Sequence, residues 1–123
     1  MPPRRLADLV YEPVHSGSLE GAELMGQASG GEGLVVKVGL WTDGRGRVKR
    51  ARHRSASCAA LIGYAEVACA LAEAGEPPEY LGAERLVAAV KGAHPGHRDR
   101  AALVASAFSR ALARRPASAE ESP

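Results

Sequence analysis

The sequence of 123 residues has few cysteines, few aromatic side chains and no long apolar run. It contains two cysteines, one tryptophan, three tyrosines and one phenylalanine. No apolar stretch approaches the roughly 20 residues that a membrane-spanning helix needs, and the first residues lack the apolar core of a signal peptide. We therefore expect a cytoplasmic protein with no membrane contact. One domain is expected over residues 1–115, with a disordered tail at 116–123.

The formal net charge of +2 is too small to indicate a nucleic-acid partner. The most basic segment of the chain, RGRVKRARHR at residues 45–54, carries six arginines and lysines. No aromatic side chain is interleaved among them to stack on bases, so we expect no nucleic-acid binding. Two interpretations of this segment stay open: either it is the solvated face of an edge strand, or it is a surface that contacts an acidic protein partner.

Strand signals dominate the first half of the chain. Residues 33–42 (GLVVKVGLWT) are β-branched and alternating, and Asp43-Gly44 is a strong hairpin turn signal. Residues 47–55 fit the returning strand, and a short third strand is expected near residues 22–27. Helical signals follow only after these strands. This order predicts an α+β fold in which a small three-stranded antiparallel sheet packs against helices.

The strongest helical segment begins near Ser57, the expected N-cap, and ends at Gly75, a favourable C-terminal residue. Its side chains are small or apolar all round, apart from Glu66 and Glu73, so we expect it to be buried. With so few aromatic residues, the core must come from Ala, Val and Leu. Further helices are expected at residues 4–12, 83–90 and 100–115.

Cys58 lies at the start of the buried helix, and its role is open on local features. The helix dipole, with Arg52 and Arg54 on the incoming strand, favours a reactive thiolate. Alternatively, Cys58 is a small core residue, as Cys69 in mid-helix is expected to be. On one helix the two cysteines would lie about 16 Å apart, too far for a disulfide. We therefore expect two free thiols.

Two histidines, His94 and His97, lie in the loop GAHPGHRDR at residues 92–100. They could donate to a metal that Cys58 or Glu32 also holds, although most surface histidines bind no metal. No nucleophile–base–acid set, phosphate loop or dinucleotide fingerprint is visible in the sequence. We therefore expect a binding or assembly protein that is not an enzyme.

From about Tyr11 to Leu112, the chain resembles the NifU/IscU-type iron–sulfur cluster scaffold family. The resemblance rests, in order, on HSGSLEGAEL, SGGEG, LVVKVGLWT, DGRGRV, KRARHRSAS, Cys58 and the small-residue helix ending AEAG, with a C-terminal helix around AALVASAF. It implies a SufE/NifU-like fold, in which a small antiparallel sheet packs against helices. It also implies that the partners are a cysteine desulfurase and other iron–sulfur assembly proteins.

The family places three cysteines and an aspartate around its nascent cluster. On this resemblance the second cysteine is Cys58. The first falls on Gly30 and the third on Arg100, while Glu32 stands in the place of the aspartate. The resemblance thus implies that Cys58 and Glu32 bind iron or a labile iron–sulfur cluster.

His94 or His97 would complete such a ligand set, and two chains could pool their Cys58 thiolates as a homodimer. Two alternatives remain within the same fold. One is a zinc site made by Cys58, Glu32 and a loop histidine. The other is an adaptor without metal that accepts persulfide sulfur from a desulfurase on Cys58.

Overall fold

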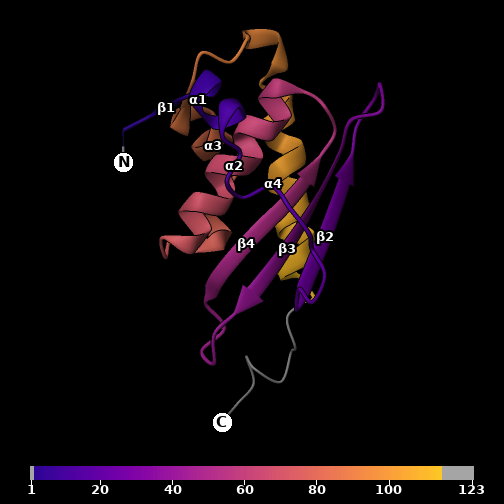
Figure 1. The fold of residues 1–123 in the computed structure, drawn as a ribbon, viewed down its shortest axis with the longest axis vertical. Helices are drawn as coiled ribbons and strands as arrows, with labels where there is room; N and C mark the ends of the chain where they lie inside the picture. The colour runs from indigo at the N-terminus through magenta and orange to yellow at the C-terminus, as the bar shows by residue number, and fades with distance from the viewer. Residues whose placement is uncertain (1, 115–123) are drawn as a thin grey trace.

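Three neighbouring antiparallel strands form the main sheet (Figure 1). The computed structural model describes residues 2–114. The strands, in the spatial order β2-β3-β4, are Leu24–Ser29, Val35–Thr42 and Val48–Ser55. The helices are α1 (Leu6–Tyr11), α2 (Ala59–Glu73), α3 (Ala83–Ala89) and α4 (Asp99–Leu112). The predicted α+β class, with its three-stranded sheet and helices, is confirmed.

Short elements complete the chain. Two-residue strands, β1 (Arg4–Arg5) and β5 (Val90–Lys91), pair in parallel, and no local pattern indicates them. The helix predicted over residues 4–12 accordingly begins only at Leu6. Single 3₁₀ turns, η1 and η2, lie at Pro78–Tyr80 and Pro95–His97. The predicted tail at 116–123 lies outside the described residues. Within residues 2–114, no helix is both long enough and apolar enough to cross a membrane.

The register of the sheet decides which side chains point toward the helices. Residues directly opposite each other on neighbouring strands share a face. Val38 pairs with Gly26 on one side and with His53 on the other, and Val36 likewise pairs with Ser55. Val36 and Val38 are completely buried. His53 and Ser55 therefore lie on the helix-covered face of the sheet, among apolar neighbours.

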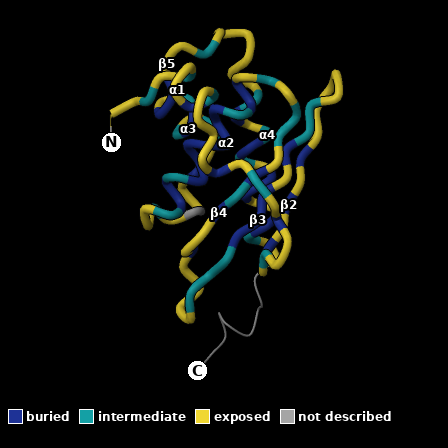
Figure 2. Tube along the Cα trace, in the orientation of Figure 1, coloured by how far each residue is buried: buried dark blue, intermediate teal, exposed yellow. Residues whose placement is uncertain are grey.

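Helices α2 and α4 cover this face (Figure 1). In α4, Ala107 approaches β2 so closely that a Cβ on Gly26 would clash with its carbonyl oxygen. Nearly the whole of α2 is buried, as its dark trace in Figure 2 shows. The predicted all-round burial of this helix is thus correct. Its boundary differs slightly, because Cys58, and not Ser57, is the residue immediately before the first turn.

The free edge of β4 is partly closed by the segment between α1 and β2. The amide of His53 donates to the carbonyl oxygen of His15 at 3.0 Å, and Gly17 donates to the carbonyl oxygen of His53 at 3.2 Å. Nearby, the amide of Ala51 donates to the Glu73 carboxylate at 2.8 Å. An open strand edge is a template for pairing with another chain. Here residues 51–53 already have their partners.

The basic segment on β4 is therefore not a uniform solvated face. Lys49 and Arg54 are exposed, as the edge-strand interpretation expects. However, Arg52 forms an ion pair with Glu73 at 2.8 Å, and the guanidinium carbon of Arg50 lies 4.8 Å from the ring centroid of Trp41. Two of the arginines on β4 are thus paired with other side chains of the fold.

Candidate functional site

Cys58 is the more accessible of the two free thiols. It is half-buried and has extended backbone geometry at the N-terminus of α2, where its side chain makes no capping hydrogen bond. Cys69 is completely buried, and its burial raises its thiol pKa well above the ordinary value. A buried neutral thiol of this kind is a small core residue, as predicted. The structure leaves Cys58 as the thiol available for chemistry.

The guanidinium of Arg100, in the first turn of α4, interacts with Cys58. The pKa of Arg100 is raised first by its hydrogen bond to Asp99 and next by the Cys58 side chain. Its Nη1 lies 2.7 Å from the Asp99 carboxylate. The Nε atom is buried and has no hydrogen-bond partner within residues 2–114. Buried donors without a partner are uncommon in folded proteins, so the Nε atom marks an unsatisfied position in this part of the fold.

The three positions that the family resemblance assigns to cysteines lie toward the same end of the sheet. Arg100 interacts with Cys58. A Cβ on Gly30 would lie 3.0 Å from the Leu103 side chain, which is one turn further along α4. The amide of Ala56 donates to the Val35 carbonyl oxygen at 2.9 Å. The segment that leads from β4 to Cys58 therefore lies beside the start of β3.

The other predicted ligands do not join Cys58. Glu32 is exposed in the β2–β3 turn, with a φ of 59°. His94 and His97 are exposed, with ring centroids 5.4 Å apart, and Nδ1 of His94 already accepts a hydrogen bond from the Gly96 amide. In the described part of the chain, no three His, Cys, Asp or Glu side chains gather so as to hold a metal ion.

This arrangement does not fit an iron–sulfur cluster held by one chain. Such a cluster is held by four ligands, which are mostly thiolates. Here one thiol, Cys58, faces a permanently charged guanidinium that cannot coordinate iron. The predicted metal site at Cys58, Glu32, His94 and His97 stays a prediction that would require a rearrangement or a second chain.

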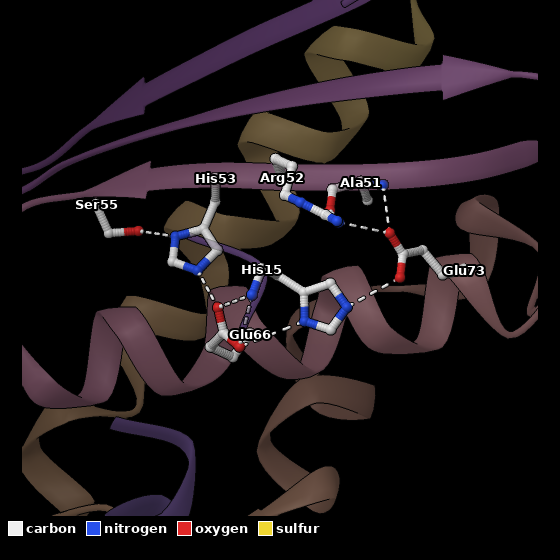
Figure 3. Close-up of polar contacts among 7 residues, drawn as sticks. All are labelled: His15, Ala51, Arg52, His53, Ser55, Glu66 and Glu73. Carbon is white, nitrogen blue, oxygen red and sulfur yellow. Dashed lines mark hydrogen bonds and ion pairs between the residues drawn. The ribbon is translucent and has the colours of Figure 1, made fainter. Parts of the chain in front are cut away.

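A second polar site, which the sequence did not predict, lies between α2 and the edge of β4 (Figure 3). We call it the His–Glu cluster, and it consists of His15, Arg52, His53, Glu66 and Glu73. The rings of His15 and His53 both approach the Glu66 carboxylate, at 3.3 and 2.7 Å. The other ring nitrogen of His15 lies 3.0 Å from Glu73. His53 and Glu66 are each only 1% exposed, so the contact between these two side chains is shielded from water.

The two carboxylates of the cluster are held in their charged form. Burial raises the pKa of Glu66, but the stronger combined effect of hydrogen bonds from His15 and His53 lowers it to about 2. In Glu73, burial is likewise outweighed by hydrogen bonds from Ala51 and His15, which lower the pKa of its carboxyl group. The Glu66 hydrogen bond is the main reason that the pKa of His15 is raised. Both carboxylates are therefore charged, and each ring nitrogen of His15 faces one of them.

His53 connects this cluster to a hydroxyl group. Its Nε2 atom faces Glu66, while its Nδ1 atom lies 2.8 Å from the Ser55 hydroxyl oxygen. Ser55, His53 and Glu66 thus form a continuous hydrogen-bonded chain, which Figure 3 shows. The sequence did not indicate this hydrogen-bonded chain, because its members lie on two different elements, β4 and α2.

A signal for the cluster was nevertheless present in the sequence. Glu66 and Glu73 are seven residues apart, two helical turns, and so share one face of an otherwise apolar helix. A buried carboxylate needs a charged or hydrogen-bonding partner. The alternation of β4 aims His53 at the helices, so it was a candidate partner. His15 could not be recognised as a partner, because it lies 51 residues from Glu66 in a glycine- and serine-rich segment.

Comparisons with protein-family models and with curated proteins find no match to this chain. The likeness to the NifU/IscU-type family thus rests on the residues quoted from the sequence, and it stays a prediction. The geometry itself identifies two places for chemistry. They are the Cys58 thiol beside Arg100 and the hydrogen-bonded chain from Ser55 to Glu66.

Proposed function

We propose that this chain acts in iron–sulfur cluster assembly as a sulfur acceptor, which takes persulfide sulfur from a cysteine desulfurase onto Cys58. The observation that carries the proposal is the pairing of a half-exposed thiol with the Arg100 guanidinium. No metal-binding group within residues 2–114 competes for that thiol. The family resemblance supplies the context of the partner, and the two free cysteines suit a reducing compartment such as the cytoplasm.

The chemistry is thiol exchange and needs no outside oxidant. The Cys58 thiolate attacks the terminal sulfur of the desulfurase persulfide, and a new S–S bond forms. The bond between that sulfur and the desulfurase cysteine breaks, and the desulfurase sulfur leaves as a thiolate. Cys58 then carries the persulfide. Arg100 and the N-terminus of α2 place positive charge beside sulfur that is anionic before and after transfer.

A partner must cover the surface around Cys58 for its persulfide to reach the thiol. A groove of about 730 Å³ is lined by residues of α1 together with Ala59, the residue after Cys58. Leu6 and Val10 give it an apolar floor, while Arg5 and Lys91 supply positive charge. Tyr11, at its end, is 85% exposed. The groove suits an apolar segment of the desulfurase that carries acidic side chains.

Binding of iron or of a labile cluster is the alternative within the same family. It would need a second chain, because one chain supplies a single accessible thiol. Anaerobic incubation with iron and sulfide, followed by size-exclusion chromatography, separates the two functions. A coloured dimer that is lost in Cys58→Ala supports the scaffold function. A colourless chain supports the sulfur acceptor.

The sulfur-acceptor function is tested by incubating the chain with a cysteine desulfurase and cysteine, followed by intact mass measurement. We expect an increase of about 32 Da that maps to Cys58. Cys58→Ala should abolish it, and Cys69→Ala is the matched control that should keep it. Arg100→Ala should slow the transfer about tenfold, because it removes the charge that faces the sulfur. An unmodified wild-type chain beside a persulfide-loaded desulfurase would reject the proposal.

A further inference from the structure

Ser55 opens onto a small polar pocket that is separate from the Cys58 thiol. The pocket has a volume of about 250 Å³ and is lined by Ser16, Gly17, Ser18, Arg54 and Ser55. The segment that closes the edge of β4 forms one wall, and the end of β4 forms the other. Ser55 itself is half-buried. The half-buried Ser55 side chain, which lines the pocket, is thus linked through one histidine to a buried ionised carboxylate.

The direction of the hydrogen bonds follows from Glu66. An ionised carboxylate can only accept, so Nε2 of His53 carries the proton on the 2.7 Å contact. In a neutral imidazole, Nδ1 is then the acceptor, and it lies 2.8 Å from the Ser55 oxygen. The hydroxyl proton therefore points at the histidine. This is the tautomer that a general base needs to activate a serine.

His15 makes this arrangement possible. It contacts the same Glu66 carboxylate through its backbone amide at 3.0 Å and through its ring. The charge of Glu66 is therefore balanced by His15, while His53 only has to donate one hydrogen bond. Without such a counter-charge, an isolated carboxylate 1% exposed would be neutralised by a proton. The cluster thus keeps a buried acceptor charged behind His53.

We propose that Ser55, His53 and Glu66 form a nucleophilic triad that accepts the acyl group of a small anionic ester in this pocket. Ser55 Oγ attacks the ester carbonyl carbon, its proton passes to Nδ1 of His53, and the alcohol leaves with that proton. Water then gives a proton to His53 and attacks the acyl carbon. Ser55 leaves and regains its proton, which completes a hydrolysis. Ser55 and His53 are the catalytic residues, and Glu66 is a positioning residue.

The pocket determines the class of ester. Its volume of 250 Å³ accommodates a short acyl group but no long chain, and its lining is mostly hydroxyl-bearing. Arg54 is exposed at the pocket and supplies its positive charge. A carboxylate or phosphate on the substrate would pair with this guanidinium. Small esters with one negative charge therefore fit better than neutral or long-chain esters.

The test uses the full chain in a Cys58→Ala background, so that the accessible thiol cannot react. An alkyl fluorophosphonate is added, and intact mass and peptide mapping are recorded. The serine oxygen displaces fluoride from phosphorus, and we expect one adduct per chain on Ser55. Ser55→Ala should remove the adduct, while Ser57→Ala, an exposed serine two residues away, should keep it. Absence of an adduct on the folded protein, or an adduct elsewhere, overturns the proposal.

Substrate preference is tested with the 4-nitrophenyl monoester of succinic acid and with neutral 4-nitrophenyl butyrate. Arg54→Ala should lower the acylation rate for the anionic ester about tenfold and leave the neutral ester nearly unchanged. An equal decrease in the acylation rate for both esters would show that Arg54 does not bind the negative charge of the substrate. Because Cys58 is absent from this background, these results are independent of the proposed sulfur transfer.

The role of Glu66 must be tested by a measurement that would not change if Glu66 only stabilised the fold. The pH profile of Ser55 labelling is such a measurement. His53 is faced by Glu66 of α2, by Ser55 on its own strand, and by His15 across Glu66. In the parent chain, labelling should rise with pH to a plateau. In Glu66→Gln the rate should fall about 10²- to 10⁴-fold and the plateau should vanish, because the His53 tautomer is no longer fixed. An unchanged profile in a folded Glu66→Gln chain contradicts the triad.

Discussion

His15 and Glu66 are 51 residues apart in sequence, yet the backbone amide and the ring of His15 both contact the Glu66 carboxylate, at 3.0 and 3.3 Å. This double contact fixes the segment before β2 against α2. The same segment closes the edge of β4 through the His15 carbonyl oxygen and the Gly17 amide. A single buried carboxylate therefore supports the edge of the sheet, the pocket beside Ser55 and the orientation of His53.

We predict that Glu66→Ala strongly destabilises the fold. The substitution leaves His15 and His53 buried without their shared acceptor, and removing one partner of a buried ion pair costs about 3–5 kcal/mol. The free energy of unfolding, from urea denaturation near neutral pH, measures this loss. Glu20→Ala is the matched control. It removes an exposed carboxylate and should change the free energy by less than about 0.5 kcal/mol. Similar effects of the two substitutions would contradict the central role of Glu66.

The stability of the fold should depend on pH in both directions. The folded pKa of His15 is raised above its ordinary 6.5, so its contribution is complete below pH 6.5 and is lost as pH rises through the raised value. The folded pKa of Glu66 is about 2 against an ordinary 4.5. Its contribution is complete above pH 4.5 and is lost as pH falls toward 2. The cluster is thus most stabilising between about pH 4.5 and pH 6.5, where both contributions are complete.

Urea midpoints measured across this range test the expectation. His15→Gln should flatten the decline on the alkaline side, because the group that loses its proton there is gone. His94→Gln, at an exposed histidine, is the control and should keep the slope of the parent chain. A midpoint that keeps rising above neutral pH would show that His15 is not the charged partner of Glu66.

The close approach of α4 to β2 gives another prediction. At Gly26 a Cβ would lie only 2.5 Å from the Ala111 amide nitrogen and would also clash with the Ala107 carbonyl oxygen. Both atoms belong to the helix backbone, so no side-chain movement can relieve the clash. Gly26→Ala should therefore destabilise the fold by about 1–3 kcal/mol or more. Gly44→Ala, where nothing lies within 4 Å, is the control for thermal denaturation.

The main elements could be predicted from the sequence because their signals are local. The alternation around Val36 and Val38 defines β3, the Asp43-Gly44 turn defines the hairpin, and the proline-free apolar segment defines α2. The β1–β5 ladder could not be predicted, because it joins two-residue strands that are far apart in the chain. Such pairs have no periodicity of their own.

The candidate site was predicted only where a local feature existed. Cys58 was recognised because it precedes a helix, but its neighbour Arg100 was known only through the family resemblance. The His–Glu cluster depends on how segments 51 and 13 residues apart pack around Glu66. Buried polar clusters of this kind are set by tertiary packing. Only the unexplained carboxylate in an apolar helix indicated that partners had to exist.

The family resemblance leads to a prediction of gained function. Gly30 and Arg100 stand where the family has cysteines, so Gly30→Cys with Arg100→Cys should place three thiols at one end of the sheet. The backbone at Gly30 is not in the left-handed region, and its new Cβ would meet only the flexible tip of Leu103 at 3.0 Å. Removing Arg100 also removes the cation beside Cys58. We expect this double variant to bind an iron–sulfur cluster, and we expect the parent monomer to bind none under the same conditions.

Anaerobic reconstitution with iron and sulfide, followed by visible absorption and iron and sulfide analysis, measures the gain. The control is Gly30→Ser with Arg100→Ser, which makes similar steric changes but supplies no thiolate. We expect a coloured protein with about two iron atoms per cluster only for the cysteine variant, and Cys58→Ala added to it should remove the colour. A colourless cysteine variant that folds normally would show that Gly30, Cys58 and Arg100 do not form a ligand set. The resemblance would then explain the order of elements but not the site.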